Sequence, residues 1–351
     1  MIFHKTLVNW YLENKRDLPW RKTKDPYLVW MSEIMLQQTR VIQGMAYFLK
    51  FSEAFPKVED LANSSESQVL KMWQGLGYYS RARNLHFTAK YVANDLAGKF
   101  PNNYKDLLQL KGIGDYTASA IASICFDEAT AVVDGNVYRV LARYFGIDTP
   151  INTNKGIKEF KLLAQSLIDK DQPGVYNQAI MDFGSMQCKP QKPSCHHCPL
   201  TNNCVAFEKQ LTKNLPVKEK KIKVKKRFFN YLVLVTAEEK TILEERTGKG
   251  IWQGLYQFPL IESSEKLLLD HLLKLDKFQH LVPEGSKISL FNQYPIIHKL
   301  THQHLDTQFW IVQTKSSTTA NIHWKEASKY PVPVLISKFL DNFDYQSTQK
   351  I

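Results

Sequence analysis

Two glycines and an aspartate within residues 110–138 give the first indication of chemistry. Gly112 and Gly114 form a short turn ahead of a run in which apolar residues recur with helical spacing. Glycine adopts backbone angles that other residues avoid, and the free N–H groups of the following helix favour an anion such as a phosphodiester. Asp134 follows two valines at a position where it caps the next helix. The segment predicts a phosphate clamp beside a carboxylate, although each feature alone also occurs in ordinary helical structure.

Four of the five cysteines form a second cluster, with the spacing C-x6-C-x2-C-x5-C. Thiols this close in the sequence of a cytoplasmic protein indicate a metal site rather than disulfides. Zinc and a [4Fe-4S] cluster both accept four cysteine ligands, so the spacing alone leaves both open. The fifth cysteine, Cys125, falls in an apolar helical run and is expected in the core. The four candidate ligands are Cys188, Cys195, Cys198 and Cys204.

The elements that must position these residues are helical up to about residue 212. Apolar residues recur there with a period near 3.6, and the interruptions are short. The predicted helices are 3–14, 29–37, 41–54, 80–97, 115–125, 136–145, 155–169 and 174–186.

The remainder of the chain has a different pattern. Alternating, β-rich runs start at Phe228 and at His304, shorter β-like runs lie at 241–245 and 255–261, and 264–275 is predicted as a helix. The segment 213–227 between the two parts carries eight basic residues and one acidic residue. It is predicted to be a solvated basic linker, so the second part is expected to be a separate α+β domain.

Bulk composition restricts the class of protein. The 351 residues are 44% hydrophobic and 23% charged, which is typical of folded domains. The net charge of +12 favours a polyanionic partner such as nucleic acid. The N-terminal segment lacks the apolar stretch of a signal peptide, and no apolar run is long enough to span a membrane. We therefore expect a cytoplasmic protein with no membrane association, acting as a monomer.

Together, the glycine hairpin, the Val-Asp-Gly aspartate and the cysteine spacing resemble the endonuclease III superfamily of base-excision DNA glycosylases. The resemblance implies a [4Fe-4S] cluster on the four cysteines, with a structural and DNA-binding role. Members with lyase activity carry a Schiff-base lysine two residues after the second hairpin glycine, where this chain has Tyr116. A phenol cannot form an imine, so β-elimination through this position is not expected. Lys111 lies on the other side of the glycines and is predicted to contact phosphate.

The segment 25–41, DPYLVWMSEIMLQQTRV, is similar to the adenine glycosylase (MutY) family, which removes adenine paired with 8-oxoguanine. The resemblance implies that Glu33 is the general acid. Apolar neighbours are expected to raise its pKa, as an acid that donates a proton at neutral pH requires. Asp134 is then expected to stabilise the oxocarbenium ion, with Tyr116 and Asn136 holding Asp134 and the attacking water.

The same resemblance implies further contacts with DNA. Gln38 matches the residue that fills the base stack when adenine is flipped out of the duplex. Arg21 and Gln178 match positions that line the adenine pocket, although family members often have glutamate at the second of these. Residues expected near the strand that carries 8-oxoguanine are Thr39, Leu76 and Tyr78.

Residues 228–345 resemble the MutT/Nudix-like C-terminal domain of that family, through KGIWQGLYQFP at 249–259. The Arg-Glu-x-x-Glu-Glu helix of a true Nudix hydrolase is missing, so pyrophosphohydrolase activity is not expected. The segment 298–304 aligns with the family's His-x-Phe-Ser-His loop, where Leu300 and Thr301 replace Phe and Ser and His302 is retained. Thr301 keeps a hydroxyl for the N7–H of 8-oxoguanine. The histidines are expected to alternate along a strand rather than bind a metal.

The sequence therefore predicts a multi-domain chain. An all-α helix-hairpin-helix glycosylase domain with an iron-sulfur loop (1–212) and the basic linker (213–227) precede an α+β MutT/Nudix-like domain (228–345) and a tail (346–351). The predicted function is a monofunctional adenine glycosylase acting on duplex DNA with A:8-oxoguanine or A:G mispairs. The alternatives are a bifunctional pyrimidine-lesion glycosylase and lyase, and an iron-sulfur DNA-binding protein without catalysis.

Overall fold

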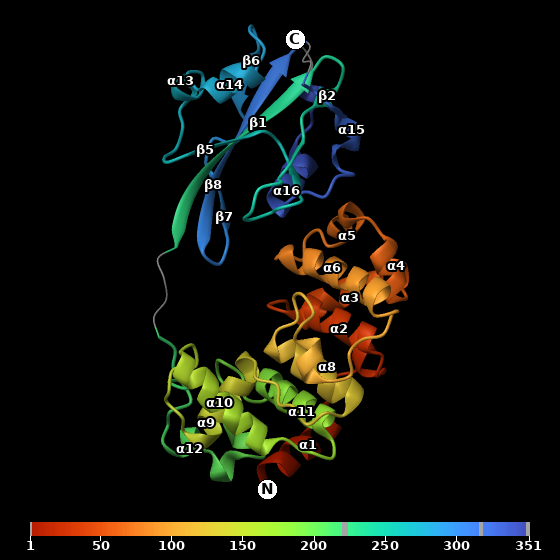
Figure 1. Cartoon of the computed structure of the whole chain (residues 1–351). Helices are drawn as coiled ribbons and strands as arrows, with labels where there is room; N and C mark the ends of the chain where they lie inside the picture. Colours follow the sequence, from red (N-terminus) through yellow and green to blue (C-terminus); the bar gives the residue numbers. More distant parts are fainter. Residues whose placement is uncertain (1, 220–223, 316–318, 349–351) are drawn as a thin grey trace. The chain divides into compact units, whose positions relative to one another are not determined.

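The fold was examined in a computed structural model, which describes residues 2–219, 224–315 and 319–348. The chain divides into two compact units (Figure 1). Unit 1 contains Met1–Asn63 and Asn84–Lys220, and unit 2 contains Ser64–Arg83 and Lys221–Ile351. Residues 64–83, which the sequence analysis assigned to the helical domain, therefore make their contacts mainly with the C-terminal part. No helix in the described part of the chain is long and apolar enough to cross a membrane.

Unit 1 is helical throughout its described residues. It contains α1 (Ile2–Asn14), η1 (Pro19–Arg21), α2 (Pro26–Leu36), α3 (Val41–Ala54), α4 (Val58–Asn63), most of α6 (Ser80–Asp95), α7 (Tyr104–Leu107), α8 (Asp115–Phe126), α9 (Gly135–Phe145), α10 (Asn154–Leu167), α11 (Pro173–Met186), η2 (Cys195–His197), η3 (Thr201–Asn203) and α12 (Val205–Glu208).

The core of unit 1 forms around α9 and α11. Buried side chains from six helices pack together there, with burial of the apolar face of each helix as the main source of stability. The largest members include Leu7, Phe160, Tyr176 and Phe183. Helices α9 and α11 approach closely because Gly184 has no side chain: a Cβ there would lie 2.6 Å from the Cβ of Asn136.

Local sequence signals fix the ends of the helices that carry the site. Asp25 caps α2, where its carboxylate accepts from the N–H of Tyr27 at 2.9 Å and Pro26 occupies the first turn. Helix α9 starts after Asp134 and ends at Gly146, whose φ of +71° is the left-handed conformation common after a helix. Gly112, with a φ of +83°, makes the turn before α8, and Gly114 caps that helix.

Unit 2 combines a mixed sheet with short helices. Its elements are α5 (Glu66–Met72), the first residues of α6, β1 (Lys225–Thr236), β2 (Lys240–Thr241), β3 (Glu244–Glu245), β4 (Tyr256–Gln257), β5 (Leu260–Ser263), α13 (Leu269–Leu272), α14 (Asp276–Leu281), β6 (Lys287–Leu290), β7 (Ile296–Lys299), β8 (Gln303–Thr314), β9 (Ile322–His323), α15 (Trp324–Ala327), α16 (Val334–Asn342) and η4 (Gln346–Thr348).

The sheet of unit 2 is built on two long parallel strands. Strands β1 and β8 pair in register from Lys225 opposite Gln303 to Thr236 opposite Thr314, and β5, β6 and β7 add antiparallel neighbours. Both central strands are buried over most of their length, which accounts for their long apolar runs. Leu272 and Phe278 of α13 and α14 pack with sheet residues in one cluster.

Most predicted elements agree with the structure within two or three residues, but two predictions are wrong. The helix predicted over 264–275 is replaced by the shorter α13 and α14, and the break lets Leu267, Leu272 and Phe278 all pack into the same core cluster. The segment 225–227, predicted as linker, begins β1, since Lys226 pairs with Asp306 and Arg227 with Glu262. Residues 220–223 of the linker and 349–351 of the tail lie outside the described residues.

Candidate active site

Seven of the predicted site residues line one cavity of about 190 Å³ in unit 1, which we call the Glu33 cavity. Its walls come from η1, α2, α8, α11 and the start of α9. Residues as far apart in the chain as Arg21 and Gln178, which are 157 positions apart, therefore converge on one space, since α2, α8 and α11 pack against one another in this order. The seven residues are Arg21, Glu33, Thr39, Tyr116, Asp134, Asn136 and Gln178.

Glu33 is a buried acid. Helix α2 is apolar around most of its surface, so it is buried nearly all round, and only 7% of Glu33 remains exposed. Burial raises the pKa of its carboxyl to about 7, and the negative charge of Asp134 acts in the same direction. A hydrogen bond with Tyr116 and the charge of Arg21 oppose that rise in pKa. The expectation of a raised pKa is confirmed, and Glu33 therefore retains its proton in part at neutral pH.

Tyr116 contacts a different partner from the one predicted. Its hydroxyl donates to the Sδ of Met181 at 3.0 Å and hydrogen-bonds with Glu33, whereas it was expected to hold Asp134. Burial raises the pKa of the phenol well above its usual value. Tyr116 is therefore a neutral hydrogen-bonding group beside the buried acid.

Asp134 is surrounded by hydrogen-bond donors. Its Oδ1 accepts from the backbone N–H groups of Asn136 and Val137 at 2.8 and 2.9 Å, and its Oδ2 accepts from Nδ2 of Asn136 at 2.8 Å. These donors and the positive end of the α9 dipole stabilise a carboxylate. Asn136 is held in turn by the guanidinium of Arg139, which donates to its Oδ1 at 2.9 Å. The predicted role of Asn136 in holding Asp134 agrees with this geometry.

A buried ion pair fixes Arg21 at another wall of the cavity. Its guanidinium donates to both carboxylate oxygens of Asp182 at 2.6 and 2.9 Å, and Arg16 also binds Asp182. Burial opposes ionisation of Asp182, but the hydrogen bonds and charges of the two arginines lower its pKa. On the same wall, the hydroxyl of Tyr11 donates to Oε1 of Gln178 at 2.5 Å.

The residues predicted to contact phosphate, and the one predicted to fill the base stack, lie on the surface of unit 1. Gly112 and Gly114 are exposed at the turn before α8, and a Cβ at Gly112 would lie 2.7 Å from the Cβ of Asn84. Lys111 is exposed with its Nζ 4.2 Å from the ring centroid of Phe87. Gln38 is exposed and has a φ of +55°, in the turn that follows α2.

All four clustered cysteines line a second, smaller cavity of unit 1. Arg143 of α9 borders it and donates to Sγ of Cys188 at 3.4 Å, as well as to the carbonyl oxygens of Lys189 and Pro190. Among the residues that the structure describes, no group of three or more His, Cys, Asp or Glu is arranged to hold one metal ion. The predicted ligands thus surround one space without forming the compact ligand set of a single ion.

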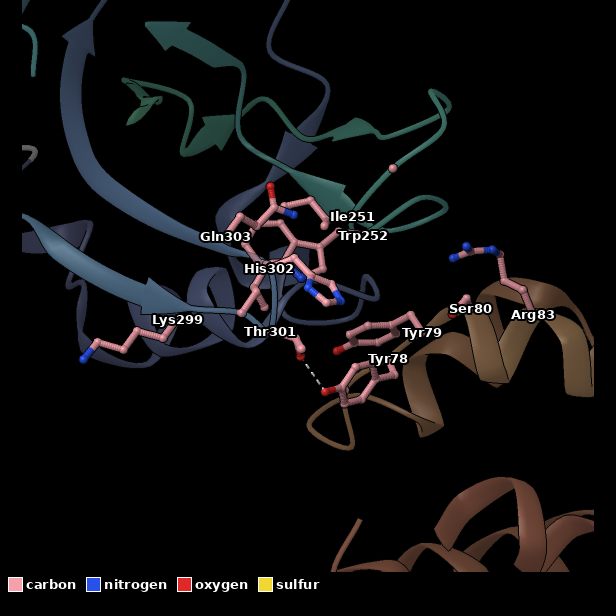
Figure 2. Close-up of a pocket in the computed structure, with 13 residues that line it drawn as sticks. Tyr78, Tyr79, Ser80, Arg83, Ile251, Trp252, Lys299, Thr301, His302 and Gln303 are labelled. Atoms are coloured by element: carbon pink, nitrogen blue, oxygen red, sulfur yellow. Dashed lines mark hydrogen bonds between the residues drawn. The ribbon is translucent and has the colours of Figure 1, made fainter. Parts of the chain in front are cut away.

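Unit 2 contains a separate pocket of about 410 Å³ (Figure 2). Tyr78, Thr301 and His302 all line it, and the hydroxyls of Tyr78 and Thr301 lie 2.8 Å apart in a hydrogen bond. Leu300 also borders the pocket, in the turn that joins β7 to β8. The histidines of 298–304 therefore lie in a hairpin with a turn at its centre, where a continuous strand was expected.

Leu76 does not line this pocket, since its side chain is 95% buried. The loop that contains it is held by two side chains that sequence analysis did not single out: the indole of Trp73 and the guanidinium of Arg81 both donate to the carbonyl of Gly77, at 3.0 and 3.2 Å. Tyr78 follows with a φ of +49° and remains half exposed.

Several residues that line the Glu33 cavity, or that hold the side chains lining it, were missed by sequence reasoning. Met181 and Asp182 lie within the same YNQAIMDFG run as Gln178, at helical spacings of three and four residues, which was the available signal. Arg139 lies three residues after Asn136 on α9, which was also an available signal. Arg16 and Tyr11 contact partners that are remote in sequence, and nothing in the chain indicated those contacts.

Comparisons with known proteins show which family this chain belongs to. Residues 31–165 match the family described as HhH-GPD superfamily base excision DNA repair protein, and residues 230–342 match the NUDIX domain. Adenine DNA glycosylase of Buchnera aphidicola subsp. Schizaphis graminum is 36% identical over 304 residues, covering 86% of this chain and 84% of that protein. The chain belongs to the adenine DNA glycosylase family. The rat adenine DNA glycosylase is 32% identical over 96% of this chain and 77% of its own length.

Solved structures support the fold of this family member. A thermostable thymine-DNA glycosylase is 33% identical, with a TM-score of 0.56 over 59% of this chain and 96% of its own. A non-covalent endonuclease III-DNA complex gives a TM-score of 0.52 at 20% identity, which bears on the fold alone. Together with the family match, these findings support an enzyme of base excision repair with a helix-hairpin-helix domain followed by a Nudix-like domain.

The raised pKa of Glu33 predicts a pH-dependent stability difference for Glu33→Gln. The unfolded carboxyl titrates near 4.5 and the folded one near 7, so the folded state binds the proton more tightly and stability is lost as the pH rises from 4.5 to 7. The neutral amide avoids that loss. We compare the free energy of unfolding of Glu33→Gln with that of the wild type at each pH. The variant should become more stable relative to the wild type by up to about 3 kcal/mol between pH 5 and pH 8.

Urea unfolding of both proteins across this pH range measures the difference. Glu53→Gln, the same change at an exposed position of α3, serves as the control and should show no such trend. A Glu33→Gln effect that is equal at pH 5 and pH 8 would contradict the assigned burial of the charge.

Proposed function

We propose that this adenine DNA glycosylase family member hydrolyses the N-glycosidic bond of adenine mispaired with 8-oxoguanine or guanine in duplex DNA, without lyase activity. The observation that carries the proposal is the pair of carboxyls in the Glu33 cavity, one buried with a pKa near 7 and one surrounded by donors. Cleavage of an N-glycosidic bond needs an acid for the leaving base and an anion for the sugar cation.

The chemistry divides between these two groups. Adenine is a poor leaving group as an anion, so protonated Glu33 delivers its proton to N7 as the bond to C1′ lengthens. Asp134, ionised and held by Asn136, stabilises the oxocarbenium ion until water attacks C1′. Tyr116, hydrogen-bonded to Glu33, positions the acid. Since Tyr116 has no amine, it cannot form the imine that β-elimination requires.

DNA binding is proposed to use surfaces on both units. In unit 1 the hairpin of Gly112 and Gly114, with Lys111 beside it, binds phosphate through backbone N–H groups and one positive charge. The target base must leave the stack to enter the Glu33 cavity, and Gln38 fills the space it vacates, with Thr39 beside it. In unit 2 the 8-oxoguanine strand is bound by Tyr78, Leu300, Thr301 and His302, and buried Leu76 supports the loop that carries Tyr78.

We further propose that Cys188, Cys195, Cys198 and Cys204 hold a [4Fe-4S] cluster, which stabilises the loop 188–204 when bound. All four thiols border one cavity and all are free, which suits a reducing compartment such as the cytoplasm. A four-iron cluster spreads its thiolates over four metal atoms, so it does not need the compact ligand set of zinc. Arg143, which donates to Sγ of Cys188, suits a ligand with negative charge. We propose that the protein acts as a monomer.

Adenine release in a single-turnover assay tests the proposed reaction. With protein in excess over a duplex that contains A:8-oxoguanine or A:G, the wild type should release adenine, and A:T should be a poor substrate. Glu33→Gln and Asp134→Asn should each lower the rate at least about a hundredfold, because each loses a charge or proton that the transition state needs.

Glu53→Gln is the matched control and should retain the wild-type rate. No release of adenine from either mispair by the wild type would contradict the proposal. Covalent trapping of the protein on DNA by borohydride would instead favour the bifunctional glycosylase and lyase.

Metal analysis tests the cluster. Protein purified without oxygen should contain about four iron atoms and about four sulfides per chain. Cys198→Ser should lose most of the iron, whereas Cys125→Ser should keep it, since Cys125 lies away from the cavity of the other four. Colourless protein that contains zinc and no iron would show that the assignment is wrong.

A further inference from the structure

Gln178 forms part of the partition between two cavities of unit 1. It lines the Glu33 cavity on one side and a neighbouring cavity of about 510 Å³ on the other. Tyr11 lines only the neighbouring cavity, so its hydroxyl reaches Gln178 from behind, as seen from Glu33. Any effect of Tyr11 on a base in the Glu33 cavity must therefore act through Gln178.

The hydrogen bond from Tyr11 distinguishes the two ends of the Gln178 amide. The phenol is 95% buried, and Oε1 of Gln178 is the acceptor of its proton, at 2.5 Å. Rotating the amide by half a turn would place Nε2 against the phenol. The bond to Oε1 is the hydrogen bond that the described structure gives this hydroxyl, so rotation would take that acceptor from its buried proton.

Arg21 and Asp182 favour the hydroxyl of Tyr11 as a hydrogen-bond donor. The guanidinium of Arg21 lies 5.6 Å from the centroid of the Tyr11 ring, and Asp182 fixes that guanidinium with two hydrogen bonds. A cation over the ring draws electron density from it and makes the hydroxyl a better donor and a poorer acceptor. Asp182 and Gln178 lie one helical turn apart on α11, so one rigid element carries both the amide and the carboxylate that fixes Arg21.

We propose that Tyr11 is a positioning residue that fixes the amide of Gln178 in the orientation that selects a 6-aminopurine over a 6-oxopurine. This inference rests on the proposed function. With the amide fixed, Nε2 donates to a ring nitrogen of the base, and the second lone pair of Oε1 accepts from the 6-amino group. An edge of adenine that carries the amino group offers this donor and acceptor pair, and glutamine amides match it.

A 6-oxopurine meets the fixed amide with the wrong groups. Hypoxanthine has a carbonyl oxygen where adenine has the amino group, so that oxygen would face Oε1, acceptor against acceptor. A rotated amide would match hypoxanthine, donating to its oxygen and accepting from its N1–H. The Tyr11 hydrogen bond disfavours that rotation, and it therefore disfavours the binding of hypoxanthine.

The test compares the single-turnover release of adenine and of hypoxanthine, each placed opposite 8-oxoguanine in the same duplex. In Tyr11→Phe the amide is free to rotate, and we expect the ratio of the hypoxanthine rate to the adenine rate to rise about tenfold over the wild type. Tyr176→Phe is the matched control, because Tyr176 is also buried, lies on α11 and has a hydroxyl without a hydrogen-bond partner in the described structure. It should leave the ratio unchanged.

A second pair of variants separates positioning from a general structural role. The two oxygens of a carboxylate are equivalent, so Gln178→Glu has no wrong orientation to prevent. Adding Tyr11→Phe to Gln178→Glu should therefore leave the ratio unchanged, whereas a purely structural effect of Tyr11 would persist. If Tyr11→Phe does not fold, Gln178→Met, which removes both ends of the amide, should raise the ratio in the same direction.

The outcomes are distinct. A wild type that releases no adenine would overturn the proposed function itself. If the wild type releases adenine and Tyr11→Phe has the same ratio of hypoxanthine rate to adenine rate, the role of Tyr11 alone is overturned. Where Tyr11→Phe is unfolded, the same ratio in Gln178→Met has that meaning. A ratio that rises equally in the Gln178→Glu background would likewise contradict amide positioning.

Discussion

The arrangement of the site depends on one electrostatic constraint: two carboxyls share a cavity of about 190 Å³ and cannot both be ionised without compensation. The two carboxyls meet this constraint because their surroundings differ. Asp134 receives two backbone N–H groups and the Asn136 amide, whereas Glu33 is buried on an apolar helix with Tyr116 as its hydrogen-bond partner. Burial therefore favours the protonated form of Glu33. The donors around the Asp134 carboxylate suit a negative charge instead.

The helices around the cavity are arranged to maintain that inequality. Helix α9 supplies the capping N–H groups at its first turn, and Gly184 lets α11 pack closely against Asn136. Further along α9, Arg139 donates to the carbonyl of Cys188 at 2.7 Å as well as to Asn136, and Arg143 contacts the cysteine loop. The loop that carries the four cysteines is thus attached to the helix that holds Asp134. A disordered cysteine loop would lose these contacts with Arg139 and Arg143, and α9 would then hold Asp134 less firmly.

Local signals in the sequence were sufficient for much of the fold and for the polar residues of the site. The cap at Asp134, the glycine turn before α8 and the apolar periodicity identified the helices. Spacing identified the cysteines, and family motifs identified Glu33 and Tyr116. Interactions between remote segments were not predictable in this way. Tyr11 and Gln178 are 167 residues apart, and the assignment of residues 64–83 to unit 2 depends on contacts made only after folding. The false helix at 264–275 has the same origin, since packing on the sheet overrides its local helical pattern.

The central claim is that burial keeps Glu33 protonated so that it can donate to the departing base. The pH dependence of single-turnover adenine release from an A:8-oxoguanine duplex tests it most directly. If Glu33 with a pKa near 7 is the acid, the rate should fall about tenfold for each pH unit well above pH 7, because only the protonated fraction is active. A rate that stays constant from pH 7 to pH 9 would contradict the account.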